Sequence, residues 1–185
     1  MEFVTLANKG NVTLIKDVLM YPLKVNRDES GILVETLRVD WKEIYGPGRE
    51  FAMQYFSVTE SGIARDEAVW HYHPQQEDRF LVAQGEIVAA VADSRESSPT
   101  NGLLNLFYMK SSIDPYMLLI PKQTLHGFIV VSSVSATLLN FPSALYNPKE
   151  EKRIPYQDAQ VKIPDGTLFS WDLVRKEFPI LSSVR

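Results

Sequence analysis

The sequence predicts an all-β protein built as a sandwich or barrel of short strands. The chain has 185 residues, and its 9 glycines and 11 prolines repeatedly interrupt short apolar runs. Regularly spaced short strands bounded by turn residues are typical of sandwiches and barrels. Helical periodicity is weak before residues 167–178. The length fits one domain with a sizeable hydrophobic core.

The expected strands follow one another along the chain between turn residues such as Gly31, Gly62, Gly85 and Pro121. The segment at 86–92 is almost continuously apolar, which is typical of a strand buried on both faces. Residues 11–23 form either a short helix or an N-terminal strand. Residues 167–178 carry apolar residues at helical spacing and predict one amphipathic helix near the end. The apolar runs that predict strands are residues 32–34, 51–58, 80–82, 87–91, 103–109, 117–120, 128–134 and 136–141.

The composition excludes several classes of function. Nineteen basic and 23 acidic residues give a net charge of −4, and no basic stripe indicates nucleic acid as a partner. The absence of cysteine excludes disulfides, thiol chemistry and cysteine-ligated metal sites. No apolar run approaches the roughly 20 residues that span a membrane, and the N-terminus does not resemble a signal peptide. We therefore expect a cytoplasmic protein that does not bind membranes.

The three histidines lie in two short motifs. His71 and His73 alternate with Tyr72, so on a strand both imidazoles project from one face and Tyr72 from the other. Glu77 follows after a proline, and His126 follows a strand and a second proline turn. This order of motifs is the general signature of a cupin barrel. We predict a cupin-type jelly-roll barrel with a short C-terminal helical segment, as one domain over 1–185 with its core at about 28–158.

The histidines allow two kinds of chemistry. In one, His71, His73, Glu77 and His126 hold a divalent metal such as Fe, Mn, Ni or Zn and leave positions open for a substrate. In the other, a histidine removes a proton from carbon without a metal. A third interpretation is that the histidines only satisfy buried hydrogen bonds.

Several segments between about Asp28 and Asp158 resemble one family of deoxysugar enzymes. The most specific is Asp93-Ser94-Arg95 followed by Ser98-Pro99-Thr100-Asn101-Gly102. Others are Trp70-His71, Ile120-Pro121 with His126-Gly127-Phe128, and Tyr146-Asn147-Pro148 with Glu150. Together they resemble the dTDP-4-dehydrorhamnose 3,5-epimerase family, whose fold is a cupin-type jelly roll. The resemblance implies a homodimer and a nucleotide-sugar substrate, a dTDP-4-keto-6-deoxyhexose, with no metal or other cofactor.

The resemblance also implies roles for individual residues. His71 is the expected base, His126 its polarising partner, and Tyr146 the best remaining phenol to return a proton. For the substrate, Arg65, Arg79 and Arg95 are candidates to bind the diphosphate, because guanidinium groups pair bidentately with phosphate oxygens. The remaining candidates for substrate contact are Glu35, Gln54 and Asn140.

The chain departs from the family at several positions. Ala68 stands where the family has an arginine three residues before the base, and Arg65 replaces that arginine if three residues are inserted. Asn140 stands where the family has its general-acid tyrosine, and an amide does not deliver a proton as a phenol does. Asp78 aligns near an expected basic residue, His73 replaces a usual glutamine, and Asp172 is a guess for the aspartate that pairs with the base. His73 with Glu77 supports a metal-dependent oxygenase or sugar isomerase instead. Asn140 supports a non-catalytic sugar-nucleotide-binding cupin, and a 3,4-ketoisomerase is a further alternative.

Overall fold

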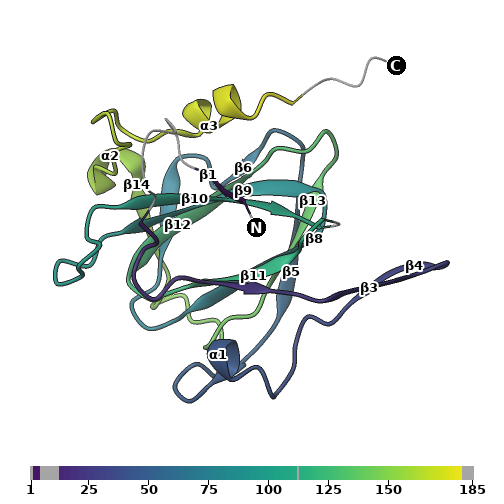
Figure 1. Cartoon of the computed structure of the whole chain (residues 1–185). Coiled ribbons are helices and arrows are strands. Elements are labelled where there is room, and N and C mark those ends of the chain that lie inside the picture. Colours follow the sequence, from purple (N-terminus) through teal and green to yellow (C-terminus); the bar gives the residue numbers. More distant parts are fainter. Residues whose placement is uncertain (1, 5–12, 112, 181–185) are drawn as a thin grey trace.

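Two antiparallel β-sheets packed face to face form the body of the protein (Figure 1). The computed structural model describes residues 2–4, 13–111 and 113–180. The larger sheet also includes β6 (Ala64–Arg65), which pairs with β12. Its other strands, in spatial order, are β1 (Glu2–Val4), β10 (Leu104–Lys110), β9 (Glu86–Asp93), β12 (Thr124–Val130), β7 (Val69–Tyr72) and β14 (Lys152–Pro155).

The smaller sheet lies across the barrel from the larger one. Its strands, in spatial order, are β2 (Leu19–Pro22), β11 (Tyr116–Ile120), β8 (Asp78–Gln84), β13 (Ala136–Asn140) and β5 (Tyr55–Thr59). Adjacent strands that are far apart in the sequence, such as β8 and β13, give the sheet its jelly-roll character. The predicted all-β jelly roll is confirmed.

Apolar side chains form three layers, one between the two sheets and one on the outer face of each sheet. The central layer lies between them and includes Ile87, Phe128 and Leu138. A second layer covers the outer face of the larger sheet, and a third covers the outer face of the smaller sheet. Strands such as β9 are therefore buried on both faces, which explains why residues 86–92 are almost continuously apolar.

Within the described residues, three short helices and one hairpin complete the fold (Figure 1). Helix α1 (Lys42–Tyr45) packs under the smaller sheet, whereas α2 (Tyr156–Ala159) and α3 (Trp171–Glu177) cover the larger one. The hairpin of β3 (Val25–Asp28) and β4 (Gly31–Val34) projects from the body. No helix in the described part of the chain is long and apolar enough to cross a membrane.

The expected elements differ from the observed ones mainly at their boundaries. The C-terminal helix occupies residues 171–177 of the predicted 167–178, and its Trp171 ring lies over Gly127, where a Cβ would come within 3.1 Å. The described part of the undecided segment 11–23 contains the strand β2. The predicted strand at 51–58 begins later, at Tyr55. Strands β7 and β14 were not among the apolar runs, because their solvent- and cavity-facing residues are polar.

Candidate active site

A cavity of about 430 Å³ opens between the two sheets. This volume falls within the usual range for small-molecule sites. The larger sheet contributes His71 from β7 and His126 from β12, which are direct cross-strand partners. The smaller sheet contributes Tyr55 and Ser57 from β5 and Asp78 from β8. The other lining residues are Met53, Arg65, Asp66, His73, Gln76, Phe80, Gly127, Phe128, Leu138, Tyr146, Asn147, Glu150, Glu151 and Arg153.

His71 is held between two carboxylates. Its Nε2 lies 2.7 Å from Asp66 Oδ2, and its Nδ1 lies 3.3 Å from Glu151 Oε1. Burial raises the pKa of Asp66, but the hydrogen bond and charge of His71, together with nearby Arg153, lower it overall. Asp66 is therefore an anion that orients the imidazole. An imidazole fixed by a carboxylate in a concave site is a common arrangement for a general base.

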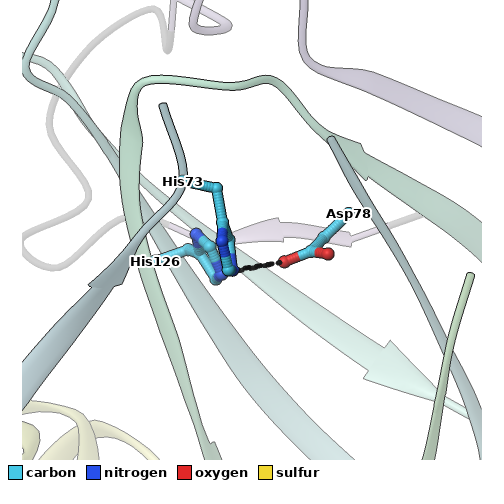
Figure 2. A group of neighbouring side chains, drawn as sticks. All are labelled: His73, Asp78 and His126. Atoms are coloured by element: carbon cyan, nitrogen blue, oxygen red, sulfur yellow. Dashed lines mark ion pairs between the residues drawn. The ribbon is translucent and has the colours of Figure 1, made fainter. Parts of the chain in front are cut away.

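His73 and His126 converge on a single buried carboxylate (Figure 2). Asp78 Oδ2 lies 3.1 Å from His126 Nε2 and 3.5 Å from His73 Nε2. On its other side, His73 Nδ1 lies 2.8 Å from Glu150 Oε2. Glu150 also accepts hydrogen bonds from the backbone N–H groups of Gln75 and Gln76. The two imidazoles thus have fixed positions at the bottom of the cavity.

The charges in this buried cluster are coupled. Burial raises the pKa of Asp78, but the hydrogen bond from His126 and the charge of the two imidazoles outweigh it, and the pKa falls to about 2. Burial lowers the pKa of His126, against the opposing attraction of Asp78. Asp78 is accordingly an anion at neutral pH, with a mostly neutral His126 donating its Nε2–H to it. Such a pair is stable in a buried site because the carboxylate keeps its hydrogen bonds.

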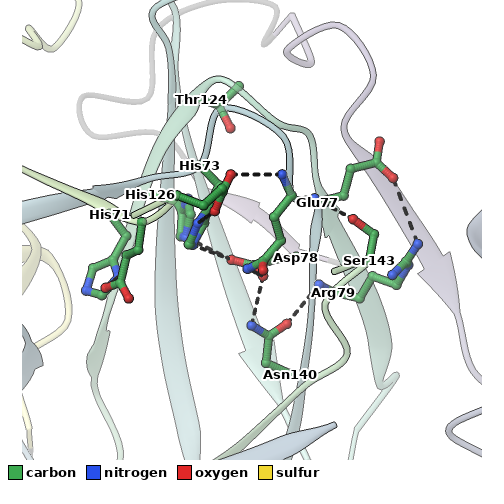
Figure 3. Close-up of polar contacts among 12 residues, drawn as sticks. His71, His73, Glu77, Asp78, Arg79, Thr124, His126, Asn140 and Ser143 are labelled. Carbon is green, nitrogen blue, oxygen red and sulfur yellow. Dashed lines mark hydrogen bonds and ion pairs between the residues drawn. The ribbon is translucent and has the colours of Figure 1, made fainter. Parts of the chain in front are cut away.

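Asn140 on β13 forms hydrogen bonds with three neighbours, of which Figure 3 labels Asp78 and Arg79. Its Oδ1 accepts a hydrogen bond of 3.0 Å from the backbone N–H of Arg79. Its Nδ2 donates to Asp78 Oδ1 at 3.0 Å and to the Tyr55 hydroxyl at 2.9 Å. Asn140 is fully buried, so we expect it to position Asp78 and Tyr55 rather than to touch a substrate.

Five of the residues predicted from the sequence line the cavity, namely His71, His73, His126, Tyr146 and Arg65. Tyr146 lies in the segment after β13 and is 66% exposed. The alternation of His71 and His73 with Tyr72 is confirmed, because Tyr72 packs into the apolar layer on the opposite face.

Two of the predicted arginines lie outside the cavity. Arg79 points to the outer face of the smaller sheet, where it is buried and donates to the carbonyls of Ile44, Phe141 and Arg49. Arg95 closes its own turn by pairing with Asp93 at 2.8 Å and with Asp17 at 3.0 Å. Both guanidinium groups are already engaged in structural contacts, so neither lies where the cavity would hold a diphosphate.

Four further predicted residues also lie away from the cavity. Glu35 is exposed and forms an ion pair with Arg38. Gln54 precedes β5 and is exposed, whereas the neighbouring Tyr55 lines the cavity. Glu77 points toward Arg49, 3.5 Å away, because its neighbour Asp78 occupies the inward position on the strand. Asp172, the guessed partner of the base, pairs instead with Arg175 on α3, and Asp66 and Glu151 take that place.

The sequence reasoning missed several residues that shape the cavity, among them Tyr55, Asp78, Asp66 and Arg153. Tyr55 and Asp78 follow from the alternation of β5 and β8 once the strand boundaries are known. Asp66 lies in a turn and Arg153 on an edge strand, and their approach depends on long-range packing, for which the local sequence carries no signal. Glu150 belongs to the family-like segment that begins at Tyr146, but no role was predicted for it.

The residues that fit a metal differ from the predicted set. His73, Asp78 and His126 each offer one ligand atom, and these three atoms lie within 4.8 Å of one another. Two imidazoles and one carboxylate are a ligand set that iron and zinc accept. Glu150 beside His73 Nδ1 resembles the carboxylate that usually supports a metal-bound histidine. His71 is engaged by carboxylates, and Glu77 points elsewhere, so neither belongs to this group.

Comparisons with known proteins place the chain among sugar epimerases. A family model described as dTDP-4-dehydrorhamnose 3,5-epimerase matches residues 12–180. A probable low-salt glycan biosynthesis epimerase, Agl13 of Haloferax volcanii, is 38% identical over 145 residues, covering 77% of this chain and 88% of the relative. The dTDP-4-dehydrorhamnose 3,5-epimerase of Shigella flexneri is 30% identical over 158 residues, covering 82% of this chain and 83% of the relative.

Solved structures agree with this placement. A dTDP sugar isomerase from Desulfovibrio desulfuricans superposes with a TM-score of 0.73 at 27% identity, covering 85% of this chain and 92% of the other. An epimerase from Legionella pneumophila in complex with dTDP-4-keto-L-rhamnose shares the fold, with a TM-score of 0.71 at 24% identity, over 98% of this chain and 99% of the other. The two sheets that hold the histidines and their carboxylates therefore form a known fold, and the chain belongs to the dTDP-4-dehydrorhamnose 3,5-epimerase family of isomerases.

Proposed function

We propose that the protein inverts a carbon next to the ketone of a nucleotide-linked 4-keto-6-deoxyhexose. The observation that carries this proposal is His71, held by Asp66 at 2.7 Å on the wall of the cavity. The named activities of the relatives support the same reaction, and the Legionella relative was solved with a dTDP-4-keto sugar. We infer dTDP as the nucleotide from these relatives.

His71 begins the reaction as general base. A ketone acidifies the hydrogen on the neighbouring carbon, because removal of that proton leaves an enolate. Asp66 favours the imidazolium that forms when His71 takes the proton. A positioned base of this kind contributes roughly 10²–10⁴-fold to the rate.

His126 is the candidate to polarise the ketone. Its ring lies beside that of His71, with 5.9 Å between the ring centroids. Asp78 Oδ2 lies 3.1 Å from its Nε2 and holds the ring in place. Burial lowers the pKa of His126 overall, against the attraction of Asp78, so the ring can donate to the ketone through its unpartnered Nδ1 only when the imidazole is protonated. A donor aimed at the developing oxyanion in an enclosed site commonly contributes more than any other single interaction.

Two arginines at the cavity are the candidates for the diphosphate. Arg65 and Arg153 both line it, and the side chain of Arg153 is 57% exposed. Arg153 contacts Asp66 and Glu151 in the free protein. A diphosphate would compete with these carboxylates for the guanidinium.

We also propose that the protein acts as a homodimer in the cytoplasm, as the sequence leads us to expect. The projecting hairpin of β3 and β4 supports the dimer, because its Ile32 and Leu33 are 46% and 62% exposed. Apolar side chains exposed on a projecting element commonly mark a surface that a partner covers.

Deuterium exchange tests the proposed reaction. A dTDP-4-keto-6-deoxyhexose incubated with the protein in D₂O should gain deuterium at a carbon adjacent to the ketone, detected by mass spectrometry and by loss of the corresponding proton NMR signal. His71→Ala should abolish this gain. Exchange that His71→Ala leaves unchanged would exclude His71 as base, and the absence of exchange with wild-type protein would exclude the reaction.

A metal-dependent reaction is the second candidate, because His73, Asp78 and His126 form a compact ligand set. None of the steps above needs a metal. Elemental analysis of the purified protein distinguishes the two. One equivalent of metal that is lost in Asp78→Asn, together with activity lost to a chelator, would favour the metal. Full activity in metal-free protein would favour the acid–base reaction.

A further inference from the structure

Inversion of a carbon needs a proton donor on the face opposite to the base. The proposed base, His71, lies on the larger sheet, so the donor must reach the substrate from the smaller sheet across the cavity. Among the described residues, the smaller sheet's strands contribute five side chains to the cavity lining: Tyr55, Ser57, Asp78, Phe80 and Leu138.

Tyr55 is the one acidic O–H donor among these five side chains. Phe80 and Leu138 carry no transferable proton, and Asp78 is an anion that accepts hydrogen bonds. Ser57 carries a hydroxyl, but an aliphatic alcohol is a much weaker acid than a phenol. The phenol of Tyr55 combines a neutral O–H group with an acidity that suits proton transfer to an enolate.

The contacts of Asn140 decide where the Tyr55 proton points. The backbone N–H of Arg79 donates to Asn140 Oδ1 at 3.0 Å, and this donor fixes the orientation of the amide. Asn140 Nδ2 must then face Asp78 Oδ1 at 3.0 Å and the Tyr55 hydroxyl at 2.9 Å. The Tyr55 oxygen therefore accepts a hydrogen bond from Asn140 and keeps its own proton for another partner. Since Tyr55 lines the cavity, a bound substrate is in place to be that partner.

The strand register fixes the positions of Asn140 and Tyr55 relative to each other. Asn140 on β13 and Tyr55 on β5 are direct cross-strand partners, so their side chains leave the sheet side by side. Burial and the negative charge of Asp78 raise the pKa of Tyr55 to about 12, against the opposing hydrogen bond from Asn140. The phenol stays protonated at neutral pH. The same hydrogen bond stabilises the tyrosinate once the proton has left.

We propose that Tyr55 is the catalytic acid that completes the inversion, and this inference rests on the proposed epimerase function. His71 removes the proton from the carbon next to the ketone, and the C–H electrons form the enolate. The enolate carbon then takes the proton of the Tyr55 hydroxyl on the opposite face, and the carbonyl re-forms. The tyrosinate regains a proton from solvent, and His71 releases its own to solvent. The step needs no oxidant or reductant.

Tyr146 is the rival phenol. It lies outside the sheets in the segment after β13 and is 66% exposed. Tyr55, although 45% exposed, sits instead on a strand, with its hydroxyl held by a fully buried amide. A group on a rigid element holds its geometry better than one in an exposed segment.

The test separates proton removal from proton return. Wild-type protein, Tyr55→Phe, Tyr146→Phe and the matched control Tyr21→Phe are incubated with a dTDP-4-keto-6-deoxyhexose in D₂O. Tyr21 lies on the outer face of the smaller sheet against Trp41, so its phenol is remote from the cavity. Deuterium at the carbon and the yield of inverted sugar are both measured. In Tyr55→Phe, inversion should fall by roughly 10²-fold or more while deuterium exchange stays within about tenfold of wild type.

A double variant that swaps the two side chains tests whether inversion can be restored. Because Tyr55 and Asn140 are cross-strand partners, Tyr55→Asn combined with Asn140→Tyr moves the phenol to the adjacent strand at the same level of the cavity. This double variant should invert the sugar at least roughly tenfold faster than Tyr55→Asn alone, since one positioned acid is restored. Circular dichroism spectra establish that each variant is folded.

Three results would overturn the assignment of Tyr55. One is inversion by Tyr55→Phe at the wild-type rate. Another is an equal loss of exchange and inversion, which would assign Tyr55 to binding. The third is loss of inversion in Tyr146→Phe with Tyr55→Phe unaffected. Wild-type protein that exchanges no deuterium would instead overturn the proposed function itself.

Discussion

At the scale of single residues, strand alternation decides which side chains meet the cavity. On β8, Asp78 faces inward while Arg79 faces outward and donates to backbone carbonyls. Tyr55 on β5 faces inward in the same way, whereas the preceding Gln54 is exposed. A strand position shifted by one residue changes the face completely. This is why the predicted Arg79, Gln54 and Glu77 were each one residue away from a side chain that lines the cavity.

The pair of His71 and Asp66 predicts losses of activity of different size for two variants. His71→Ala should lower kcat by roughly 10²–10⁴-fold, because the base is gone. Asp66→Asn keeps the shape but removes the charge that favours the imidazolium formed during the reaction, so we expect a smaller loss of kcat than in His71→Ala. Steady-state rates of the two variants measure both effects. An Asp66→Asn variant with the wild-type kcat would contradict the role of Asp66.

The buried pair of Asp78 and His126 predicts loss of stability in acid. The folded-state pKa of His126 is lowered, so the unfolded chain binds a proton first and stability falls as pH drops through about 6.5. The pKa of Asp78 is lowered from 3.8 to about 2, so its stabilisation is present above pH 3.8 and is lost as pH falls toward 2. The Asp78 contribution corresponds to about 2 kcal/mol.

Urea unfolding at a series of pH values checks this prediction. Asp78→Asn should flatten the decline of the unfolding free energy below pH 4, since the variant has no carboxyl to protonate there. The exposed Asp158 on α2 serves as the matched control, and Asp158→Asn should leave the decline unchanged. An identical decline in wild type and Asp78→Asn would show that the carboxyl is not coupled to folding.

At the scale of elements, the turn at residues 93–102 is a structural motif. Asp93 accepts hydrogen bonds from Arg95, Ser98 and Thr100. Burial raises the pKa of Asp93, but these hydrogen bonds outweigh it and hold the pKa well below its usual range. The segment was the most specific family match in the sequence, and its conformation shows that Arg95 stabilises the turn.

Removing the Asp93 carboxylate should destabilise this turn. Asp93→Ala should lower the unfolding free energy by about 3 kcal/mol, because it leaves the Arg95 guanidinium and two hydroxyls without their acceptor. Urea unfolding measures the change, and Glu96→Gln at an exposed site of the same turn is the control. The kcat of the folded fraction should stay within about twofold of wild type, well below the loss expected for a catalytic group. A rise in KM without a change in kcat would instead assign Arg95 to substrate binding.

At the scale of the whole molecule, each face of the sheets has its own role. The inner faces enclose the cavity, whereas α3 and α1 cover the outer faces. The β3–β4 hairpin projects beyond this body with apolar residues exposed (Figure 1).

The hairpin predicts the oligomeric state. Ile32→Glu with Leu33→Glu should convert a dimer into a monomer, because two buried carboxylates without partners would oppose association. Size-exclusion chromatography with light scattering measures the mass. Val134→Glu, at another exposed apolar site, should leave the dimer intact. A wild-type monomer, or a dimer that persists in the double variant, would contradict the proposed interface.

The sequence by itself determined the all-β fold class, the C-terminal helix and the shared face of His71 and His73. These features follow from local periodicity and from turn residues, which neighbouring positions in the chain record directly. Tertiary structure decided that Asp66 pairs with His71, that Asp78 receives His126, and that Asn140 aims Tyr55 at the cavity. Asp78 with His126 and Asn140 with Tyr55 join residues that are 48 and 85 positions apart. Their distances depend on strand register and on the packing of the two sheets, which no local pattern encodes.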